Sequence, residues 1–312
     1  MTILHPEFLV ETAWLEAHLG DPELRILDCT ISRETGPDGV VRLASGRDIW
    51  ARGHIPTSVF ADFVADLSDR ESMLPSMMPP AEQFAEAMSR YGVGPGTRVI
   101  VYDGSEGSWP HMWSARVWWM LRVFGFDNAA VLNGGWHKWT QEGRPVSTEP
   151  SPYPPAVFTP RYRPDLIAEK DEVRAAVASS STALVNTLPR DVHAGESTTF
   201  ERAGHIAGSV NVPIVGLVDP ETHAYLPADE LRRQFEEVGA LDSERVITYC
   251  RAGIAASSGA FVLALLGAPN VAIYDGSLAE WTADPDLPME TGPGKQPAPS
   301  DKAQPLGVAD GD

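Results

Sequence analysis

A short segment of small residues around one cysteine carries the clearest chemical signal in this chain. Residues 249–256 read Tyr-Cys-Arg-Ala-Gly-Ile-Ala-Ala, so Cys250 is followed by a fixed positive charge at Arg251 and by Gly253. Glycine permits close approach of the backbone, and a guanidinium stays charged at any physiological pH. A cysteine in such an electropositive turn favours the thiolate, which is the nucleophilic form. The segment therefore predicts a reactive Cys250.

The elements on either side of this segment must position the cysteine. Residues 246–249 form an apolar run typical of a buried strand, and the apolar run 257–266 predicts a helix. Cys250 would then lie at a strand-to-helix turn, where backbone N–H groups converge beside the positive end of the helix dipole and can hold an anion. The alternative is an unreactive core residue, because free cysteine is among the most buried residue types. Arg251 and Gly253 favour the reactive interpretation.

Length and charge exclude several classes of function. With 312 residues the chain is long enough for two domains of ordinary size. A net charge of −19 without a basic stripe argues against nucleic acid as a partner. No run approaches eighteen apolar residues, and the first residues do not resemble a secretion signal. The two cysteines, Cys29 and Cys250, suggest neither a disulfide framework nor a thiolate zinc site. We expect a cytoplasmic protein without a membrane segment or a bound metal.

An internal repeat divides the chain. Three pairs of matching segments follow one another in the same order, centred on His54 and His205, Asp103 and Cys250, and Trp139 and Trp281. Such ordered matches indicate a duplicated domain. The first copy has Asp103 in the place of Cys250, so it lacks the nucleophile. Residues that both copies share are predicted to be structural, and the two histidines are predicted to hold turns together by hydrogen bonds.

The repeat and the composition give the expected domain boundaries. We expect a first domain at 1–146, an extended linker with six prolines at 147–164, the cysteine-bearing domain at 165–294 and a disordered tail at 295–312. Within each half, Val- and Ile-rich runs alternate with amphipathic stretches. That alternation predicts an α/β fold, with a mainly parallel sheet covered by helices on both faces. Sites in such sheets lie at the carboxyl ends of strands, where Cys250 is expected.

The ordered motifs resemble those of the two-domain rhodanese family of sulfurtransferases, over roughly residues 8–292. Besides the Cys250 segment they include Gly-His-Ile-Pro at 53–56, Val-Leu-Asn-Gly-Gly at 131–135 and Tyr-Asp-Gly-Ser at 274–277. The resemblance implies tandem rhodanese-like domains and a thiosulfate or 3-mercaptopyruvate sulfurtransferase. In this family the cysteine attacks the outer sulfur of a donor, becomes a persulfide and passes that sulfur to a thiophilic acceptor such as cyanide or a thiol. The family chemistry requires no cofactor.

The resemblance also assigns residue roles. Cys250 is the implied nucleophile, Arg251 orients the donor, and Asp62 either faces Cys250 from the first domain or caps a turn. The implied cradle for the persulfide and the donor anion consists of Arg251, Ala252, Gly253, Ile254, Ala255 and Ala256. Because the cradle is made of backbone amides, it does not need the Thr that family members commonly have at the position of Ala255.

Thiosulfate is the expected donor. Family members that favour thiosulfate have Arg after the cysteine and usually a second cation next, whereas those that use 3-mercaptopyruvate usually have Gly followed by Ser or Thr. This chain has Arg251 and then Ala252. The Asp-x-Arg motif of the family reads Asn-Thr-Leu here, so its cation is missing at Leu188. Arg190 is either a replacement that binds substrate or a solvated surface residue.

Two other functions fit parts of the pattern. A phosphatase with a cysteine loop at a helix N-terminus needs a longer loop that ends in Arg, and this chain has Ala256 there. A persulfide carrier that is loaded by a partner protein, with little activity on small donors, is the second interpretation, since the chain is acidic and lacks the family's Arg. Loading by a protein desulfurase but not by small donors would distinguish the carrier from the enzyme.

Overall fold

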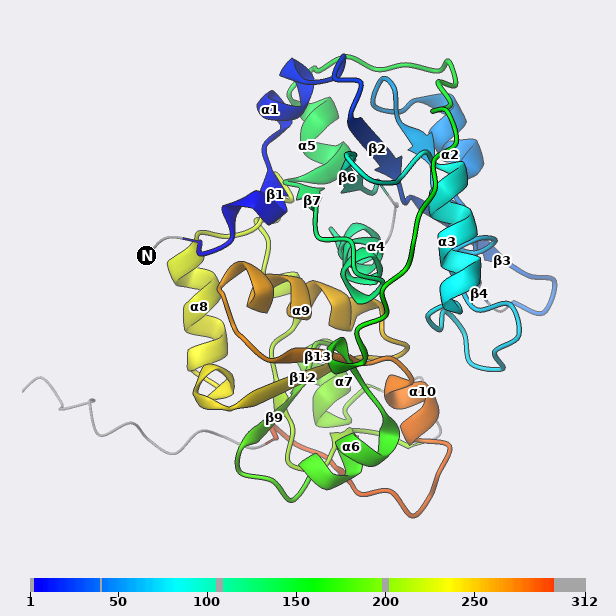
Figure 1. Cartoon of the computed structure of the whole chain (residues 1–312). Coiled ribbons are helices and arrows are strands. Elements are labelled where there is room, and N and C mark those ends of the chain that lie inside the picture. The colour runs from blue at the N-terminus through cyan, green and yellow to red at the C-terminus, as the bar shows by residue number, and fades with distance from the viewer. Residues whose placement is uncertain (1–2, 40, 105–108, 198–201, 295–312) are drawn as a thin grey trace, which may run out of the picture.

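The computed structural model describes residues 3–39, 41–104, 109–197 and 202–294. The tail predicted at 295–312 lies outside the described residues. The chain forms two units of similar design, each built on a five-stranded parallel sheet (Figure 1). The predicted α/β fold with two mainly parallel sheets is thus confirmed.

The first unit contains a sheet with the order β1-β7-β6-β2-β5. Its strands are β1 (Leu9–Val10), β2 (Leu24–Asp28), β5 (Val59–Phe60), β6 (Arg98–Tyr102) and β7 (Ala129–Leu132). Its helices are α1 (Thr12–Ala17), α2 (Arg47–Arg52), α3 (Ala81–Arg90), α4 (Met112–Val123) and α5 (Gly135–Gln141). An antiparallel ribbon of β3 (Ile31–Thr35) and β4 (Val41–Ser45), which the sequence pattern did not predict, extends from this unit.

The second unit repeats this plan. Its strands are β8 (Ile167–Ala168), β9 (Thr182–Asn186), β11 (Val210–Asn211), β12 (Arg245–Tyr249) and β13 (Val271–Tyr274). Its helices are α6 (Lys170–Ala176), α7 (Arg190–Ala194), α8 (Ala228–Glu236), α9 (Ile254–Leu265) and α10 (Ser277–Trp281). A short ribbon pairs β10 (His205–Ile206) with β14 (Met289–Glu290). The sheet order β8-β13-β12-β9-β11 matches the first sheet strand for strand, as a duplicated domain requires.

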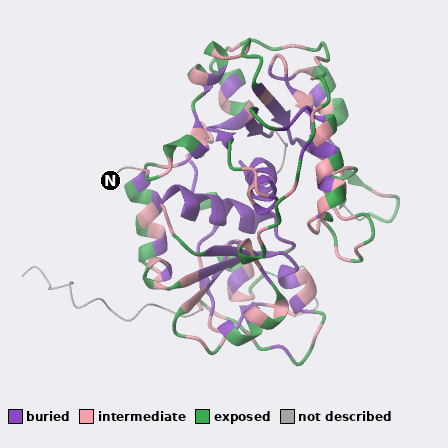
Figure 2. Cartoon of the chain, viewed as in Figure 1, coloured by how far each residue is buried: buried purple, intermediate pink, exposed green. Residues whose placement is uncertain are grey.

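Helices α4 and α9 pack against each other between the two sheets (Figures 1 and 2). All twelve residues of α9 and eleven of the twelve in α4 are buried. Across this contact Trp118 meets Phe261 edge-on, with ring centroids 4.8 Å apart. The opposite face of the first sheet is covered by α1 and α5, and α6 lies against the second sheet at β9. Each sheet therefore has helices on both faces.

The residues shared by the two copies are structural, as predicted. His54 Nδ1 lies 2.9 Å from the carbonyl of Trp50, and His205 Nδ1 lies 2.7 Å from the carbonyl of His193. Both histidines are fully buried. Trp139 and Trp281 are also fully buried, and each indole N–H donates to a proline carbonyl a few residues later. All four side chains thus hold local backbone segments together from buried positions.

The segment between the two units has no helix or strand from 148 to 163, all of which is described. It follows the first unit as an extended strap (Figure 1). The backbone N–H groups of Ala156 and Arg161 donate to carbonyls of Ser89 and Phe124, at the ends of α3 and α4. The strap is thus tied to the surface of the first unit along its course.

Candidate active site

Cys250 lies at the carboxyl end of β12, in a turn of only four residues. β12 ends at Tyr249 and α9 begins at Ile254, three residues before the helix start predicted from sequence. Residues 254–256, predicted to belong to the loop, form the first turn of the helix, and Gly253 precedes them in a left-handed conformation with a φ of 73°. Cys250 is 1% exposed, so its thiol is enclosed by the turn and its surroundings.

The turn is fixed by the start of α10. The Ser277 hydroxyl accepts hydrogen bonds from the N–H groups of Cys250 and Gly253, both at 3.1 Å, and donates to the Tyr274 carbonyl at 2.7 Å. The N–H groups of Leu278 and Ala279 donate to the carbonyls of Cys250 and Arg251. The Gly253 amide therefore holds the turn, rather than pointing into the cradle that the sequence predicted.

We expect Ser277→Ala to lower the free energy of unfolding by about 2–4 kcal/mol, because it leaves two buried N–H donors without an acceptor. Sulfur transfer should fall with it, as the turn loses its fixed geometry. Chemical denaturation followed by tryptophan fluorescence measures the first effect. The control is Ser258→Ala, which removes one donor to the His111 carbonyl and leaves no N–H unpaired. Equal losses in the two variants would contradict the role of Ser277.

In the first unit, Asp103 occupies the position that corresponds to Cys250. Asp103 follows β6 as Cys250 follows β12, and its Oδ2 accepts the N–H groups of Trp113 and Ser114, at 3.1 and 2.7 Å, in the first turn of α4. Burial raises the pKa of Asp103 to about 6, against the opposing effect of these hydrogen bonds. The duplicated fold therefore places a titratable side chain before the N-terminus of the corresponding helix in each unit: Asp103 before α4 and Cys250 before α9.

Asp103 should make stability depend on pH. Its pKa in the folded state, about 6, exceeds the value near 4 of an unfolded Asp, so its contribution is fully present below about pH 4 and is lost as pH rises through about 6. We expect the unfolding free energy of the unaltered protein, relative to Asp103→Asn, to fall by roughly 2–3 kcal/mol between pH 4 and 7. Urea denaturation of both proteins at each pH measures this difference. If their unfolding free energies changed in parallel with pH, the raised pKa of Asp103 would be contradicted.

The other residues of the predicted cradle differ in exposure. Arg251 is exposed, while Ala252 to Ala256 are buried. Ala255 and Ala256 fall in the first turn of α9, where N–H groups have no acceptor within the helix. Such amides, together with the helix dipole, stabilise an anion at the helix start. The turn can thus offer amides to a negative sulfur, and the exposed Arg251 follows Cys250 directly in sequence.

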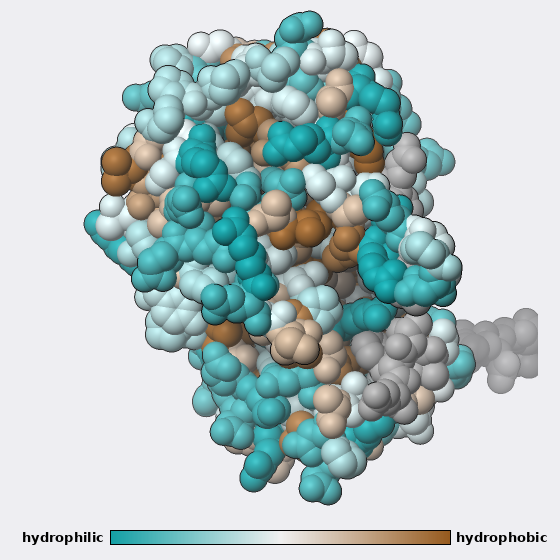
Figure 3. Space-filling view, turned by 90° about the vertical axis from the view of Figure 1, so that its right-hand side faces the viewer, coloured by the Kyte–Doolittle hydropathy of each residue, from teal (hydrophilic) through white to brown (hydrophobic). Residues whose placement is uncertain are grey.

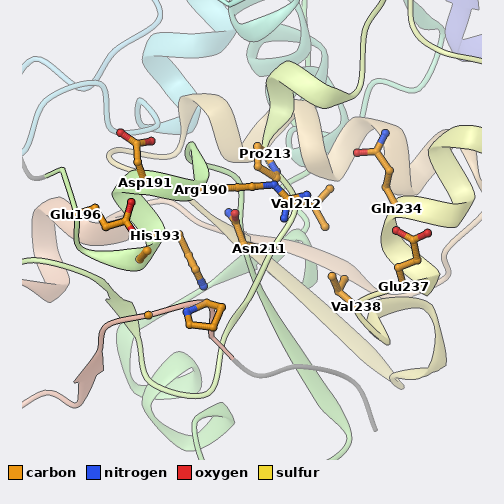
Figure 4. Close-up of a pocket in the computed structure, with 13 residues that line it drawn as sticks. Arg190, Asp191, His193, Glu196, Asn211, Val212, Pro213, Gln234, Glu237 and Val238 are labelled. Atoms are coloured by element: carbon orange, nitrogen blue, oxygen red, sulfur yellow. The ribbon is translucent and has the colours of Figure 1, made fainter. Parts of the chain in front are cut away.

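Among the described contacts, none joins Asp62 or Arg190 to Cys250. The Asp62 carboxylate accepts the Ala65 N–H at 3.0 Å and the Ser45 hydroxyl at 2.7 Å, so it caps a turn, one of its two predicted roles. Arg190 is exposed at the start of α7 and points toward Val212 and Pro213 (Figure 4).

The pocket that Arg190 lines, of about 450 Å³, has neither Cys250 nor any residue of 251–256 among its described walls. Leu188, where the family has its Arg, is buried. Direct replacement of the missing cation by Arg190 is therefore not supported by this geometry.

Sequence reasoning missed a charged pair beneath the turn. Arg116 on α4 and Asp275 after β13 are both buried, and their Nη1 and Oδ1 atoms are 2.6 Å apart. A pocket of about 560 Å³ adjoins Asp275 between the units, and Met77 and Met78 are among its other lining residues. On the face that carries α3 and α10, Figure 3 shows hydrophobic side chains in a recess with hydrophilic surroundings. The signal in the sequence was Arg116 in the middle of a mostly apolar helix, since a buried Arg requires a partner.

Other sites are not supported by the described part of the chain. Within it, no three His, Cys, Asp or Glu side chains are grouped so as to hold a metal ion. The helices found there are too short or too polar to cross a membrane.

Comparison with known proteins shows the same architecture. The family model of the rhodanese-like domain matches residues 11–142 and 171–284. A sulfur carrier protein of Thermus thermophilus is 33% identical, over 94% of this chain and 99% of its own. The thiosulfate sulfurtransferase of Rattus norvegicus is 34% identical, over 88% of this chain and 91% of its own. The crystal structure of the 3-mercaptopyruvate sulfotransferase SseA of Escherichia coli, at 32% identity, superposes with a TM-score of 0.75 and covers 86% of this chain and 98% of that one.

Proposed function

The chain belongs to the rhodanese family of tandem-domain sulfurtransferases, and from that premise we propose that Cys250 carries a sulfane sulfur from thiosulfate to a thiophilic acceptor. The observation that supports this most is the buried Cys250 between the end of β12 and the first turn of α9. The proposed acceptors are cyanide or a small thiol.

The proposed reaction has two displacement steps. The Cys250 thiolate attacks the outer sulfur of thiosulfate, the bond between the two thiosulfate sulfurs breaks, and sulfite leaves with the electron pair. The product on the protein is a persulfide anion. Cyanide then attacks the terminal sulfur, thiocyanate leaves, and the thiolate is restored. Each intermediate keeps one negative charge on sulfur, which the amides at the start of α9 are placed to stabilise.

The choice of thiosulfate rests on the residues of the turn, because relatives of similar identity are named for both donors. Sulfite leaves as a stable anion and needs no proton, whereas pyruvate leaves from 3-mercaptopyruvate as an enolate that must be protonated. Ala252 and Ala255 carry no hydroxyl that could deliver a proton or hold the carboxylate. Arg251 supplies a charge that suits a dianion.

We expect faster thiocyanate formation from thiosulfate and cyanide than from 3-mercaptopyruvate and cyanide. Arg251→Gln should lower kcat/KM for thiosulfate about tenfold, since a charge-assisted contact is lost, and Arg251→Lys should retain most of it. Colorimetric assay of thiocyanate with both donors measures the preference. A preference for 3-mercaptopyruvate in the unaltered protein would overturn the proposed donor.

A protein-fed sulfur carrier is the second candidate. The buried Leu188 in place of the family's Arg weakens the site for small anions, and a relative of similar length is named a sulfur carrier protein. Incubation with a cysteine desulfurase and cysteine, followed by mass measurement of the intact chain, tests it. Persulfide formation there, with silence on both small donors, would favour the carrier over the enzyme.

A further inference from the structure

A buried ion pair joins the two units beneath the Cys250 turn. Arg116 projects from the middle of α4 in the first unit and is 0% exposed, and Asp275, between β13 and α10 in the second, is 5% exposed. Their closest atoms, Nη1 and Oδ1, are 2.6 Å apart. Charges so far from water are tolerated only when paired, so removing one partner leaves the other as a full, poorly screened charge.

Both charges lie against the turn itself. A Cβ placed on Gly253 would be 2.3 Å from Asp275 Oδ1 and 3.1 Å from Arg116 Nη1. Gly253 is three residues from Cys250, and the N–H groups of both residues share the Ser277 hydroxyl, two residues after Asp275. The ion pair and the cysteine are therefore parts of one compact arrangement.

The first unit holds the pair from a second segment as well. Arg116 Nη2 donates to the Ser76 carbonyl at 3.1 Å, and the Met78 N–H donates to Asp275 Oδ2 at 2.7 Å. Ser76, whose carbonyl accepts the hydrogen bond from Arg116, adopts a left-handed conformation with a φ of 63°. Two parts of the unit without the nucleophile thus fix the position of Asp275.

We propose that Arg116 and Asp275 are a positioning pair that sets the electrostatic potential at Cys250, so that the first unit contributes charge as well as shape to the site. This inference rests on the proposed function of Cys250. Paired, the two charges nearly cancel at the turn. Unpaired, Arg116 favours a sulfur anion and Asp275 opposes one. Among the described residues, other charged or titratable groups near the turn and the pair include Arg251, next to Cys250 in sequence, and Glu280 on α10, which is hydrogen-bonded to Tyr274 and paired with Lys170. Tyr162 and Glu169 line the same pocket as Asp275.

The test measures the charge effect directly. In a Cys29→Ala background, the rate of Cys250 alkylation by iodoacetamide is followed from pH 5 to 10, and the midpoint of each profile is compared. Asp275→Asn leaves Arg116 unpaired, and Arg116→Met leaves Asp275 unpaired. We expect the midpoint of Asp275→Asn to lie at least about one pH unit below that of Arg116→Met, from Coulomb interactions at this range.

Matched charge changes elsewhere provide the control. The half-exposed pair Arg163 and Asp127, 2.6 Å apart, does not touch the turn, so Asp127→Asn and Arg163→Met should share one midpoint. If the pair had only a structural role, Asp275→Asn and Arg116→Met would shift the alkylation midpoint in the same direction. The proposal would be overturned if Asp275→Asn and Arg116→Met had the same midpoint, or if the midpoint of Asp275→Asn were the higher one.

Folding of each variant is verified by thermal unfolding. If Arg116→Met does not fold, Asp275→Asn is compared with the unaltered protein: a lower midpoint supports the proposal, and an unchanged or higher one contradicts it. Alkylation requires no sulfur donor. Failure of sulfur transfer would therefore count against the proposed function without altering these midpoints.

Discussion

Replacing Cys250 with Ser should reduce sulfur transfer from thiosulfate to cyanide by more than about a thousandfold, because the proposed mechanism holds the transferred sulfur on the Cys250 thiol. A serine hydroxyl at this turn is a far weaker nucleophile toward sulfur, and it forms no persulfide. Thiocyanate assays measure the loss. The intact mass after treatment with thiosulfate alone should show one added sulfur atom in the unaltered chain and none in Cys250→Ser.

Cys29 offers the matched control. It is also free and fully buried, but burial raises the pKa of its thiol well above the ordinary value, and the carboxylates of Asp28 and Asp103 raise it further. Such a thiol stays protonated and unreactive. We expect Cys29→Ala to keep transfer activity and the added sulfur. Loss of the added sulfur in Cys29→Ala, with retention in Cys250→Ser, would reject the assignment of the nucleophile.

The second large effect is expected at Gly253. Its φ of 73° disfavours any side chain, and a Cβ there would lie 2.3 Å from Asp275 Oδ1, an atom held by a buried ion pair that cannot easily move away. Gly253→Ala should therefore lower the free energy of unfolding by about 3 kcal/mol or more. By displacing the turn that carries Cys250, it should also lower transfer about a hundredfold.

Gly239 distinguishes the effect of backbone strain from that of the steric collision. Its φ is 72°, and a Cβ there would have no atom within 4 Å. Gly239→Ala carries the same conformational strain without the collision, so we expect a cost of about 1 kcal/mol and unchanged transfer. Denaturation and thiocyanate assays on the two variants compare them. A similar cost in both would show that the space beneath Gly253 is not critical.

The fold was predictable because its signals are local or repeated. The strand over Arg245–Tyr249 and most of the helix over Ile254–Leu265 follow from apolar runs, and the duplication supplied the plan of two matching sheets. The antiparallel ribbon of β3 and β4 was missed, since its strands are partly polar and project away from the core.

The site was predictable only in part. Cys250 and its turn follow from residue types within eight consecutive positions, whereas the partners that fix the turn come from distant segments. Arg116 and Asp275 meet only because α4 packs on α9, a contact that no local pattern reports. Arg190 is close to Leu188 in sequence, yet it begins a helix that directs it toward another pocket. Proximity along the chain was a poor guide to the missing cation.

The burial of α4 and α9 against each other also bears on how the protein unfolds and opens. One hydrophobic cluster contains Trp118 of the first unit and Phe261 of the second, together with core residues of both sheets. Either half alone would expose an apolar helix to water, so the halves should melt in a single cooperative transition. Hinge bending between them would break that core, so we expect the two halves to stay closed while Cys250 reacts.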